Sequence, residues 1–255
     1  MGYLSGQGKV YAGKRDANGN TLDFDFLGNV PSFQLALNVD VLEHKESTSG
    51  QRLIDLRLIT GKKVDLTMNV QEFTPENFAL LLQGVVDTQG AGTVTAEQLN
   101  GGNAIVAGDT YALAGKDVAS LVLTDSTGSP LTLATPADYI PNLPYGLVDI
   151  ISAGAYVAPI KAAYTKKTNQ KSVGMFTTAE SIRWLRFLAV NTAQKTTAGA
   201  YKRFVLDLFN VQFDPATGLG LIQDTIADNE LKGSVLVDPT RLTGSQVGVL
   251  TWIDN

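Results

Sequence analysis

The chain has 255 residues, of which 44% are hydrophobic and 18% charged, so it has the composition of a folded globular protein and not of a disordered or fibrous one. It contains no cysteine, which excludes disulfides, thiolate metal sites and cysteine nucleophiles. Its net charge of −5 is not typical of a protein that grips nucleic-acid phosphates, because such binding needs clustered Lys and Arg.

The N-terminal region predicts a β-hairpin. Asn18-Gly19 separates two strand-like runs, residues 8–15 and 21–28, and this dipeptide is the strongest short hairpin signal. The run from Gly8 to Lys14 also matches most of a phosphate-binding loop. Arg15 stands where that motif needs Ser or Thr, and a hairpin follows instead of a helix, so we interpret the run as a glycine-punctuated strand.

Two long strands are predicted next, at residues 33–43 and 64–70. Apolar and mostly polar residues alternate in both, which indicates antiparallel strands with one buried face and one wet face. Extended at about 3.3 Å per residue, 33–43 spans roughly 36 Å. That length favours the wall of a barrel or tube.

A charged segment, residues 44–63, lies between these strands. Its five basic and two acidic side chains give it +3, so the rest of the chain carries −8. A basic segment on an acidic body favours self-association.

One helix is well marked, at residues 75–83. Thr74 is suited to cap it, Pro75 suits its first position, and Gly84 is expected to close it in the left-handed conformation. Its apolar stripe is Phe78, Leu81 and Leu82. A second, short helix is predicted at 95–99.

The composition shifts at about residues 86 and 168. Residues 87–167 are rich in Gly, Ala, Thr, Asp and Pro, and contain short strand-and-turn units. We expect an inserted small β domain there, within a discontinuous body formed by 1–86 and 168–255. In the body, 182–190 and 203–213 have apolar residues on both faces, which predicts that a helix or a neighbouring subunit covers their second face.

The sequence predicts no catalytic residue, no metal site and no cofactor. His44 is the only histidine and lies in a run of charges, which favours a solvated loop position. Asp23 and Asp25 share a strand face, but the spacing of a calcium loop is missing. We therefore interpret them as acidic residues of a hairpin and not as metal ligands. Trp184 and Trp252 are interpreted as packing residues, since no basic groove accompanies them.

The most distinctive stretch, residues 42–84, reads LEHKESTSGQRLIDLRLITGKKVDLTMNVQEFTPENFALLLQG. It resembles the major tail tube proteins of long-tailed (siphovirus-like) bacteriophages, with a similar strand, charged loop, Lys-Lys strand and E-F-T-P-E-N helix. Residues 28–30 and the C-terminal runs YKRFVLDLFNVQFDP and LKGSVLVDP are similar to the same family. The resemblance covers about 1–84 and 172–255.

The resemblance implies a mainly β subunit: an antiparallel β-sandwich or half-barrel with one flanking α-helix, plus the inserted β domain. It also implies hexameric rings that stack into a hollow tube conducting DNA to the host. The implied inter-ring stacking loop contains His44, Lys45, Glu46, Arg52, Asp55 and Arg57. Strand parity suggests a lumen face of Gln34, Asn38, Asp40, Asp65, Thr67 and Asn69. The doubly apolar strands suggest an intra-ring interface of Trp184, Phe187, Phe209 and Phe213.

The implied partners are further copies of the chain and the tape-measure, tail terminator and tail-tip or baseplate proteins, with DNA passing through the lumen without specific binding. The expected location is the tail tube of the virion, assembled in the host cytoplasm. No apolar run approaches the ~18 residues of a membrane span, and the start lacks a secretory signal, so no membrane and no export are expected. Two alternatives remain open: a surface- or glycan-binding module in which 87–167 is adhesive, and an enzyme of another type.

Overall fold

The computed structural model describes residues 6–16, 18–48, 50–167, 170–177, 182–192, 195, 199 and 201–253. The expectation that the start carries no export signal falls partly on residues 1–5, which lie outside this set. The chain forms two compact units: residues 1–86 with 173–255, here called the body, and residues 87–172, the second unit. Sheets are antiparallel throughout the described pairings, and one α-helix flanks them, so the predicted mainly-β fold is confirmed. None of the helices in the described part of the chain has the length and apolar character that crossing a membrane requires.

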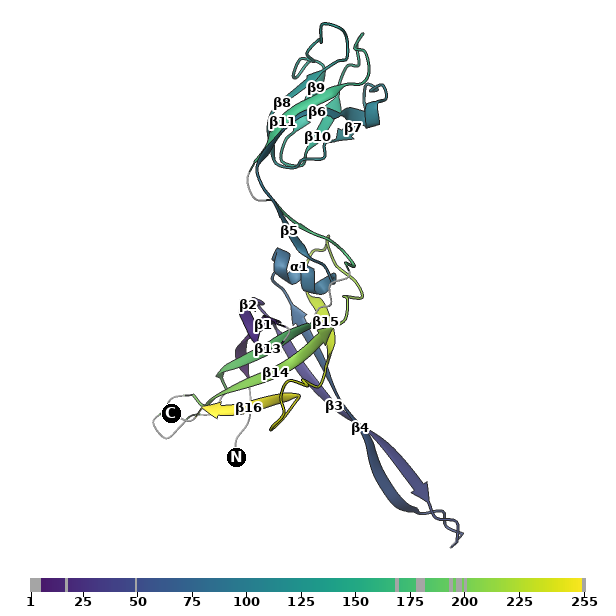
Figure 1. Cartoon of the computed structure of the whole chain (residues 1–255), viewed down its shortest axis with the longest axis vertical. Helices are drawn as coiled ribbons and strands as arrows, with labels where there is room; N and C mark the ends of the chain where they lie inside the picture. The colour runs from purple at the N-terminus through teal and green to yellow at the C-terminus, as the bar shows by residue number, and fades with distance from the viewer. Residues whose placement is uncertain are drawn as a thin grey trace. The chain divides into compact units, whose positions relative to one another are not determined.

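The body contains an eight-stranded sheet with the order β2-β1-β13-β14-β15-β4-β3, in which β16 also pairs with β14 (Figure 1). Its strands are β1 (Gln7–Arg15), β2 (Thr21–Phe26), β3 (Ser32–Lys45), β4 (Ile54–Val70), β13 (Ile182–Asn191), β14 (Arg203–Phe213), β15 (Asn229–Val235) and β16 (Gly248–Ile253). The predicted N-terminal hairpin is β1–β2. Asp16 accepts hydrogen bonds from the backbone of Asn18 and Asn20, and Gly19 takes a positive φ of 80°.

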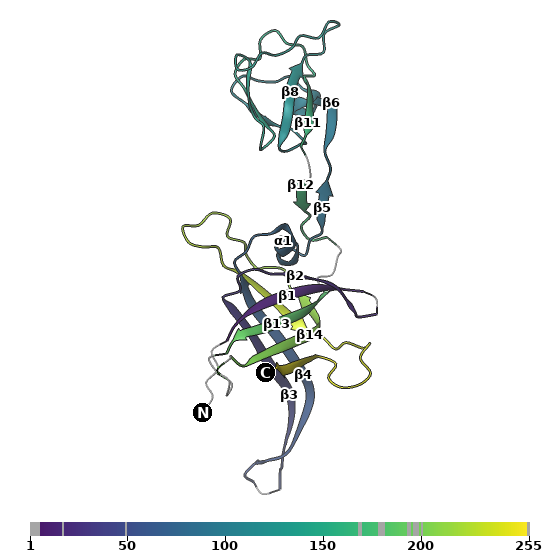
Figure 2. The same cartoon turned by 90° about the vertical axis from the view of Figure 1, so that its left-hand side faces the viewer.

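The sheet curls around one hydrophobic core. Val10 on β1 and Met68 on β4 belong to the same buried cluster although their strands lie far apart in the strand order. Leu80 and Leu81 of the helix complete that cluster. A single curled sheet covered by one helix is therefore the scaffold of the body (Figure 2).

A β-bulge explains why β14 seemed apolar on both faces. In the pairing with β13, Arg183 lies opposite Val211 but Leu185 lies opposite Leu208, so β14 has one extra residue there. The bulge reverses the side-chain parity, so that Leu208 before it and Val211 and Phe213 after it all reach the core. The expectation that 203–213 needs outside cover on a second face is corrected accordingly.

The helix α1 spans Pro75–Leu81, two residues shorter than predicted, and Thr74 caps it by accepting a hydrogen bond from Asn77 N at 3.1 Å. Gln83, and not Gly84, takes the left-handed conformation, with φ of 46°. Gly84 is needed for a different reason, because a Cβ there would clash with the Gly174 carbonyl oxygen. The buried helix residues are Asn77, Ala79, Leu80 and Leu81, which corrects the predicted stripe.

The second unit has two three-stranded sheets that share one core, and β5 (Val86–Gln89) with β12 (Gln170–Val173) forms a two-stranded ribbon. Its other elements are β6 (Gly92–Gln98), the short 3-10 segment η1 (Leu99–Gly102), β7 (Thr110–Ala112), β8 (Val118–Thr124), β9 (Tyr139–Asn142), β10 (Leu147–Ile150) and β11 (Lys161–Lys166). The helix predicted at 95–99 is wrong, because β6 occupies 95–98 and η1 begins only at Leu99. Inside this core, burial and a hydrogen bond to Glu97 raise the pKa of Tyr164 to about 12.

Candidate functional site

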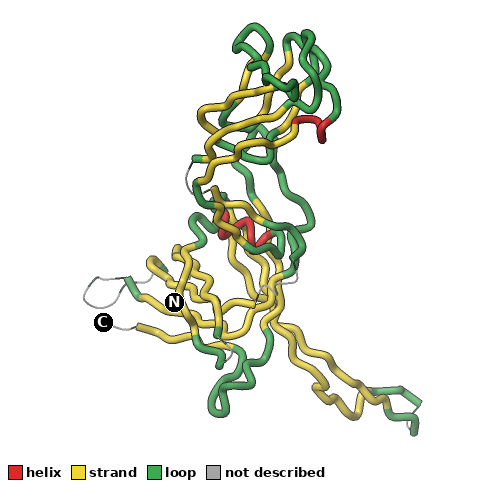
Figure 3. The backbone as a smooth tube through the Cα atoms, turned by 45° about the horizontal axis from the view of Figure 1, so that its top comes forward, coloured by secondary structure: helices red, strands yellow, loops and turns green. Residues whose placement is uncertain are grey.

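The distal half of the β3–β4 hairpin, residues 39–62, projects from the body as a two-stranded ribbon, here called the arm (Figure 3). β15 pairs with β4 only as far as Val64, so among the described strands β3 alone accompanies β4 beyond that point. β3 has 14 residues and β4 has 17, both far above the usual ~5–6. The predicted charged loop is therefore mostly strand, and among the described residues only 46–48 and 50–53 lie in the tip between the strands.

The arm exposes a series of large apolar side chains. Leu42 and Leu58 lie directly opposite each other and are 59% and 47% exposed. Val39, Leu53, Ile54, Leu56 and Ile59 are exposed to a similar degree. Clustered apolar side chains on an open ribbon typically mark an interaction surface. Our sequence reading missed them, although the alternation in LIDLRLI at 53–59 is the signal that would have revealed them.

Two charge pairs join the two strands of the arm. His44 Nδ1 lies 2.6 Å from Asp55 Oδ1, and Arg57 Nε lies 3.8 Å from Glu43 Oε1. Residues 39–62 contain four basic and four acidic side chains, so the +3 counted along 44–63 is not the charge of the folded arm. His44 is exposed as expected, but it lies on β3 instead of in a loop.

The remaining charged residues of the arm differ in whether they already have a bonding partner. Glu46 accepts hydrogen bonds from the backbone and hydroxyl of Thr48 at 2.9 and 2.8 Å. Among the ion pairs of the described residues, Lys45, Arg52 and Lys62 have no acidic partner. The arm therefore offers apolar contact area together with three basic side chains that are in none of these ion pairs.

The six predicted lumen residues lie on one face of β3–β4, opposite the core side chains Leu66 and Met68. Asp65 makes several of the hydrogen bonds on this face. It accepts from Asn38 Nδ2 at 3.1 Å and from Ser234 Oγ at 3.0 Å. The hydrogen bond from Lys63 is the main cause of the lowered pKa of Asp65. The other four residues of the set are Gln34 and Asp40, both exposed, and Thr67 and Asn69, both half-buried. The face as a whole is polar, and its role in a lumen stays a prediction.

The predicted intra-ring interface is not one surface. Phe213 is 0% and Phe209 4% exposed, so both are covered within the chain. Phe187 is half-buried and stacks on Phe33 with ring centroids 5.4 Å apart. Trp184, also half-buried, donates to Asp207 Oδ1 at 3.1 Å and meets Phe209 edge-on. Internal packing explains these aromatic residues without a neighbouring subunit.

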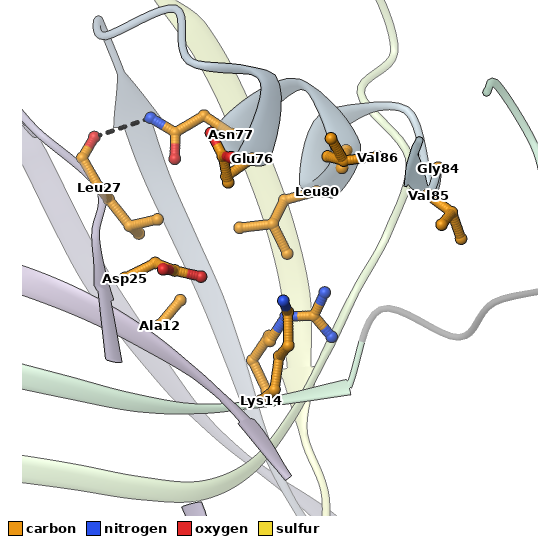
Figure 4. A pocket seen from close by; sticks show the side chains of 12 residues that line it. Ala12, Lys14, Asp25, Leu27, Glu76, Asn77, Leu80, Gly84, Val85 and Val86 are labelled. Carbon is orange, nitrogen blue, oxygen red and sulfur yellow. Dashed lines mark hydrogen bonds between the residues drawn. The ribbon is translucent and has the colours of Figure 1, made fainter. Parts of the chain in front are cut away.

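A cavity of about 220 Å³ lies between α1 and the strands β1 and β2 (Figure 4). Lys14, Asp25 and Arg183 line it, and Asn77 Nδ2 donates to Leu27 O at 3.1 Å at its edge. Burial lowers the pKa of Arg183, opposed by the charges of Asp25 and Asp23. Among the described residues, no three His, Asp or Glu side chains are grouped to hold a metal. The cavity has opposite charges close together but no nucleophile–base pair, so the arm is the stronger candidate site.

Comparison with known proteins adds a family to this description. No curated protein matches the chain. The family model described as "Protein of unknown function UCP028589" matches residues 3–252, nearly the whole chain. The chain therefore belongs to that family.

Proposed function

We propose that this chain is a structural subunit that assembles with copies of itself into stacked hexameric rings, forming a hollow tail tube of the kind found in long-tailed bacteriophages. The observation that carries the proposal is the arm, which presents apolar side chains that nothing in the described chain covers. A subunit with such an element is suited to assembly.

The energetics favour a partner for the arm. Burying apolar surface stabilises by about 25 cal/mol per Å², and an isolated two-stranded ribbon is at best marginally stable in water. The arm gains that stabilisation only when another molecule covers Leu42, Leu56 and Leu58. In a closed ring or a continuous stack, such a contact joins two different surfaces of neighbouring copies.

The polar face of β3 and β4 supports a conduit. Asp40 and Asp65 introduce negative charge, and Lys63 is already paired with Asp65. A lining with little free positive charge lets DNA slide without a grip on its phosphates. The tape-measure, terminator and tail-tip partners, and the virion location, belong to this proposal through the sequence resemblance.

The test is removal of the arm. Joining Asn38 directly to Lys63 through Asn-Gly retains the pairing of Leu35 with Leu66 and removes residues 39–62, because Asn38 and Lys63 lie opposite each other. We expect the full chain at high concentration to form rings or tubes in negative-stain images, and the truncated chain to stay monomeric while it still unfolds cooperatively in urea. The measurement is made with and without tail-tip proteins as initiators. A wild-type chain that forms no polymer under either condition would overturn the proposal.

A further inference from the structure

The cavity between α1 and the strands β1 and β2 is lined by charged side chains that are not paired with one another. Lys14 and Arg183 lie directly opposite each other where β1 pairs with β13, so they share one face of the sheet. Like charges in that position destabilise a sheet. Asp25 lines the cavity from β2, yet the ion pairs of the described residues include none of these three side chains. The cavity therefore holds charges that a bound ligand could pair.

Asn77 adds a buried hydrogen-bond acceptor from α1. It is 3% exposed, and its Nδ2 donates to Leu27 O at 3.1 Å and to Glu72 O at 2.8 Å. Within the described part of the chain no group donates to its Oδ1. Figure 4 shows this oxygen on the side of the cavity where Asp25 lies. Because an unpaired buried acceptor lowers stability, a donor from a ligand is favoured there.

The size and the remaining lining of the cavity favour a small aliphatic ligand. The cavity has a volume of about 220 Å³. An apolar cavity of about 150 Å³ already holds benzene, so this one has room for roughly six to ten non-hydrogen atoms. Lys14 is exposed, so the cavity is open to solvent beside it. Six of the lining residues are apolar: Ala12, Leu27, Ala79, Leu80, Val85 and Val86.

The balance of charge favours a ligand with both signs. Two basic residues, Lys14 and Arg183, and two acidic residues, Asp25 and Glu76, line the cavity. A simple anion would be attracted by the first pair and repelled by the second, and a simple cation would meet the reverse. A ligand with one carboxylate and one ammonium group gains charge-assisted hydrogen bonds at both ends. Aliphatic α-amino acids carry these two groups on a body of the right size.

We propose that this cavity binds an aliphatic α-amino acid. The carboxylate of the ligand accepts hydrogen bonds from Lys14 and Arg183. Its ammonium group donates to Asp25 and to Asn77 Oδ1, and its aliphatic side chain packs against Leu80. The site lies within one copy, so this inference goes beyond the proposed function and does not rest on it.

An NMR titration of the full chain, at a concentration too low for polymers, tests the site with L-valine. Isovalerate lacks the ammonium group of valine, and isobutylamine lacks its carboxylate, so the two compounds are matched controls. We expect L-valine to shift the signals of residues that line the cavity, and each control compound to bind at least tenfold more weakly. No shifts with L-valine, or equal affinities for L-valine and isovalerate, would overturn the proposal.

Two variants assign the ends of the ligand. Lys14→Met should weaken binding of L-valine at least tenfold but change that of isobutylamine by less than about twofold, because isobutylamine has no carboxylate. Asp25→Asn should weaken binding of L-valine but not of isovalerate. Lys9→Met, on the same strand but outside the cavity lining, is the matched control and should bind L-valine as the wild type does.

The same spectra show whether each variant is folded, since signals away from the cavity should keep their wild-type positions. Equal losses of L-valine and isobutylamine binding in folded Lys14→Met would show that Lys14 does not contact the carboxylate, and would overturn the proposal. Polymer formation is not measured in this experiment. Failure here therefore leaves the proposed function standing, and failure of the chain to polymerise leaves this inference standing.

Discussion

The proximal and distal halves of the β3–β4 hairpin have the same kind of sequence but opposite environments. Leu66 and Met68 in the proximal half are 1% and 0% exposed, whereas Leu56 and Leu58 in the distal half are 49% and 47% exposed. Leu56, Leu66 and Met68 each lie between polar or charged residues along β4, and Leu58 follows Arg57. The difference is that β15 and α1 cover the proximal half, and no described element pairs with the distal half except its own partner strand.

This difference shows that the alternation of apolar and polar residues identifies a strand face that is suited to burial. It does not show whether the same chain or another molecule buries that face. In the proximal half the cover is intramolecular, so those residues contribute to folding stability. In the distal half the same pattern leaves apolar side chains exposed, and we propose that they serve assembly. Truncations in the two halves should therefore change different measured quantities.

Leu66→Ala should lower the free energy of unfolding by about 3 kcal/mol, since it removes a fully buried side chain and leaves a cavity. Leu58→Ala on the same strand should lower it by less than about 1 kcal/mol, because that side chain is half exposed. Urea unfolding of dilute protein measures both. Equal losses would mean that the arm is folded into the core of its own chain.

Asp238→Asn should destabilise the body by roughly 2 kcal/mol near neutral pH, because Asp238 is fully buried and its Oδ2 lies 2.9 Å from Arg15 Nη2. Burial by itself acts to raise the pKa of Asp238, but hydrogen bonds from Thr240 and the nearby Arg15 outweigh it and the net pKa is lowered. A lowered pKa means that the stabilisation is present above the unfolded value of about 3.9 and is lost as the pH falls through the folded value. The difference in the free energy of unfolding between wild type and variant should therefore decrease below about pH 4. Urea unfolding over a pH series measures it. The arm-truncated chain should show the same dependence; loss of it there would assign the effect to the arm.

Thr74→Ala should lower the free energy of unfolding by about 1 kcal/mol, because it removes the N-cap hydrogen bond of α1. Thr60 provides a matched control on the arm, where its hydroxyl donates to Asp40 O at 3.2 Å in an exposed setting. Thr60→Ala should cost less than about 0.5 kcal/mol. Thermal unfolding of the two variants side by side makes the comparison, and a larger loss for the arm variant would contradict it.

Reversing Arg52 and Arg57 to Glu should change the free energy of unfolding by no more than about 0.5 kcal/mol, because exposed ion pairs such as Arg57–Glu43 stabilise little. Polymer length in negative-stain images should nevertheless fall sharply. Arg52→Lys with Arg57→Lys keeps the charges and is the matched control. Normal polymers in the double reversal would show that the charges of the arm do not take part in stacking.

Local signals predicted much of the body. The Asn18-Gly19 hairpin, the first long strand and the Thr74-capped helix each depend on neighbours in sequence, and each was found near its expected bounds, whereas the second long strand begins at Ile54, ten residues before its predicted start. The errors arose where a side chain's direction depends on pairing with another strand. The bulge in β14 moved Val211 and Phe213 to the core face, and pairing with β3 turned the supposed charged loop into a ribbon.

The sequence alone determined that this chain is a cysteine-free, mainly antiparallel β protein with long alternating strands, because period-two patterns, turns and caps act over a few residues. Only the tertiary structure decided which apolar faces are covered within the chain and which are left to a partner. Coverage depends on strands far apart in sequence, such as β4 and β15, and no local pattern encodes their meeting. For the same reason only the fold reveals that the arm lies beyond the last residue of β4 that pairs with β15.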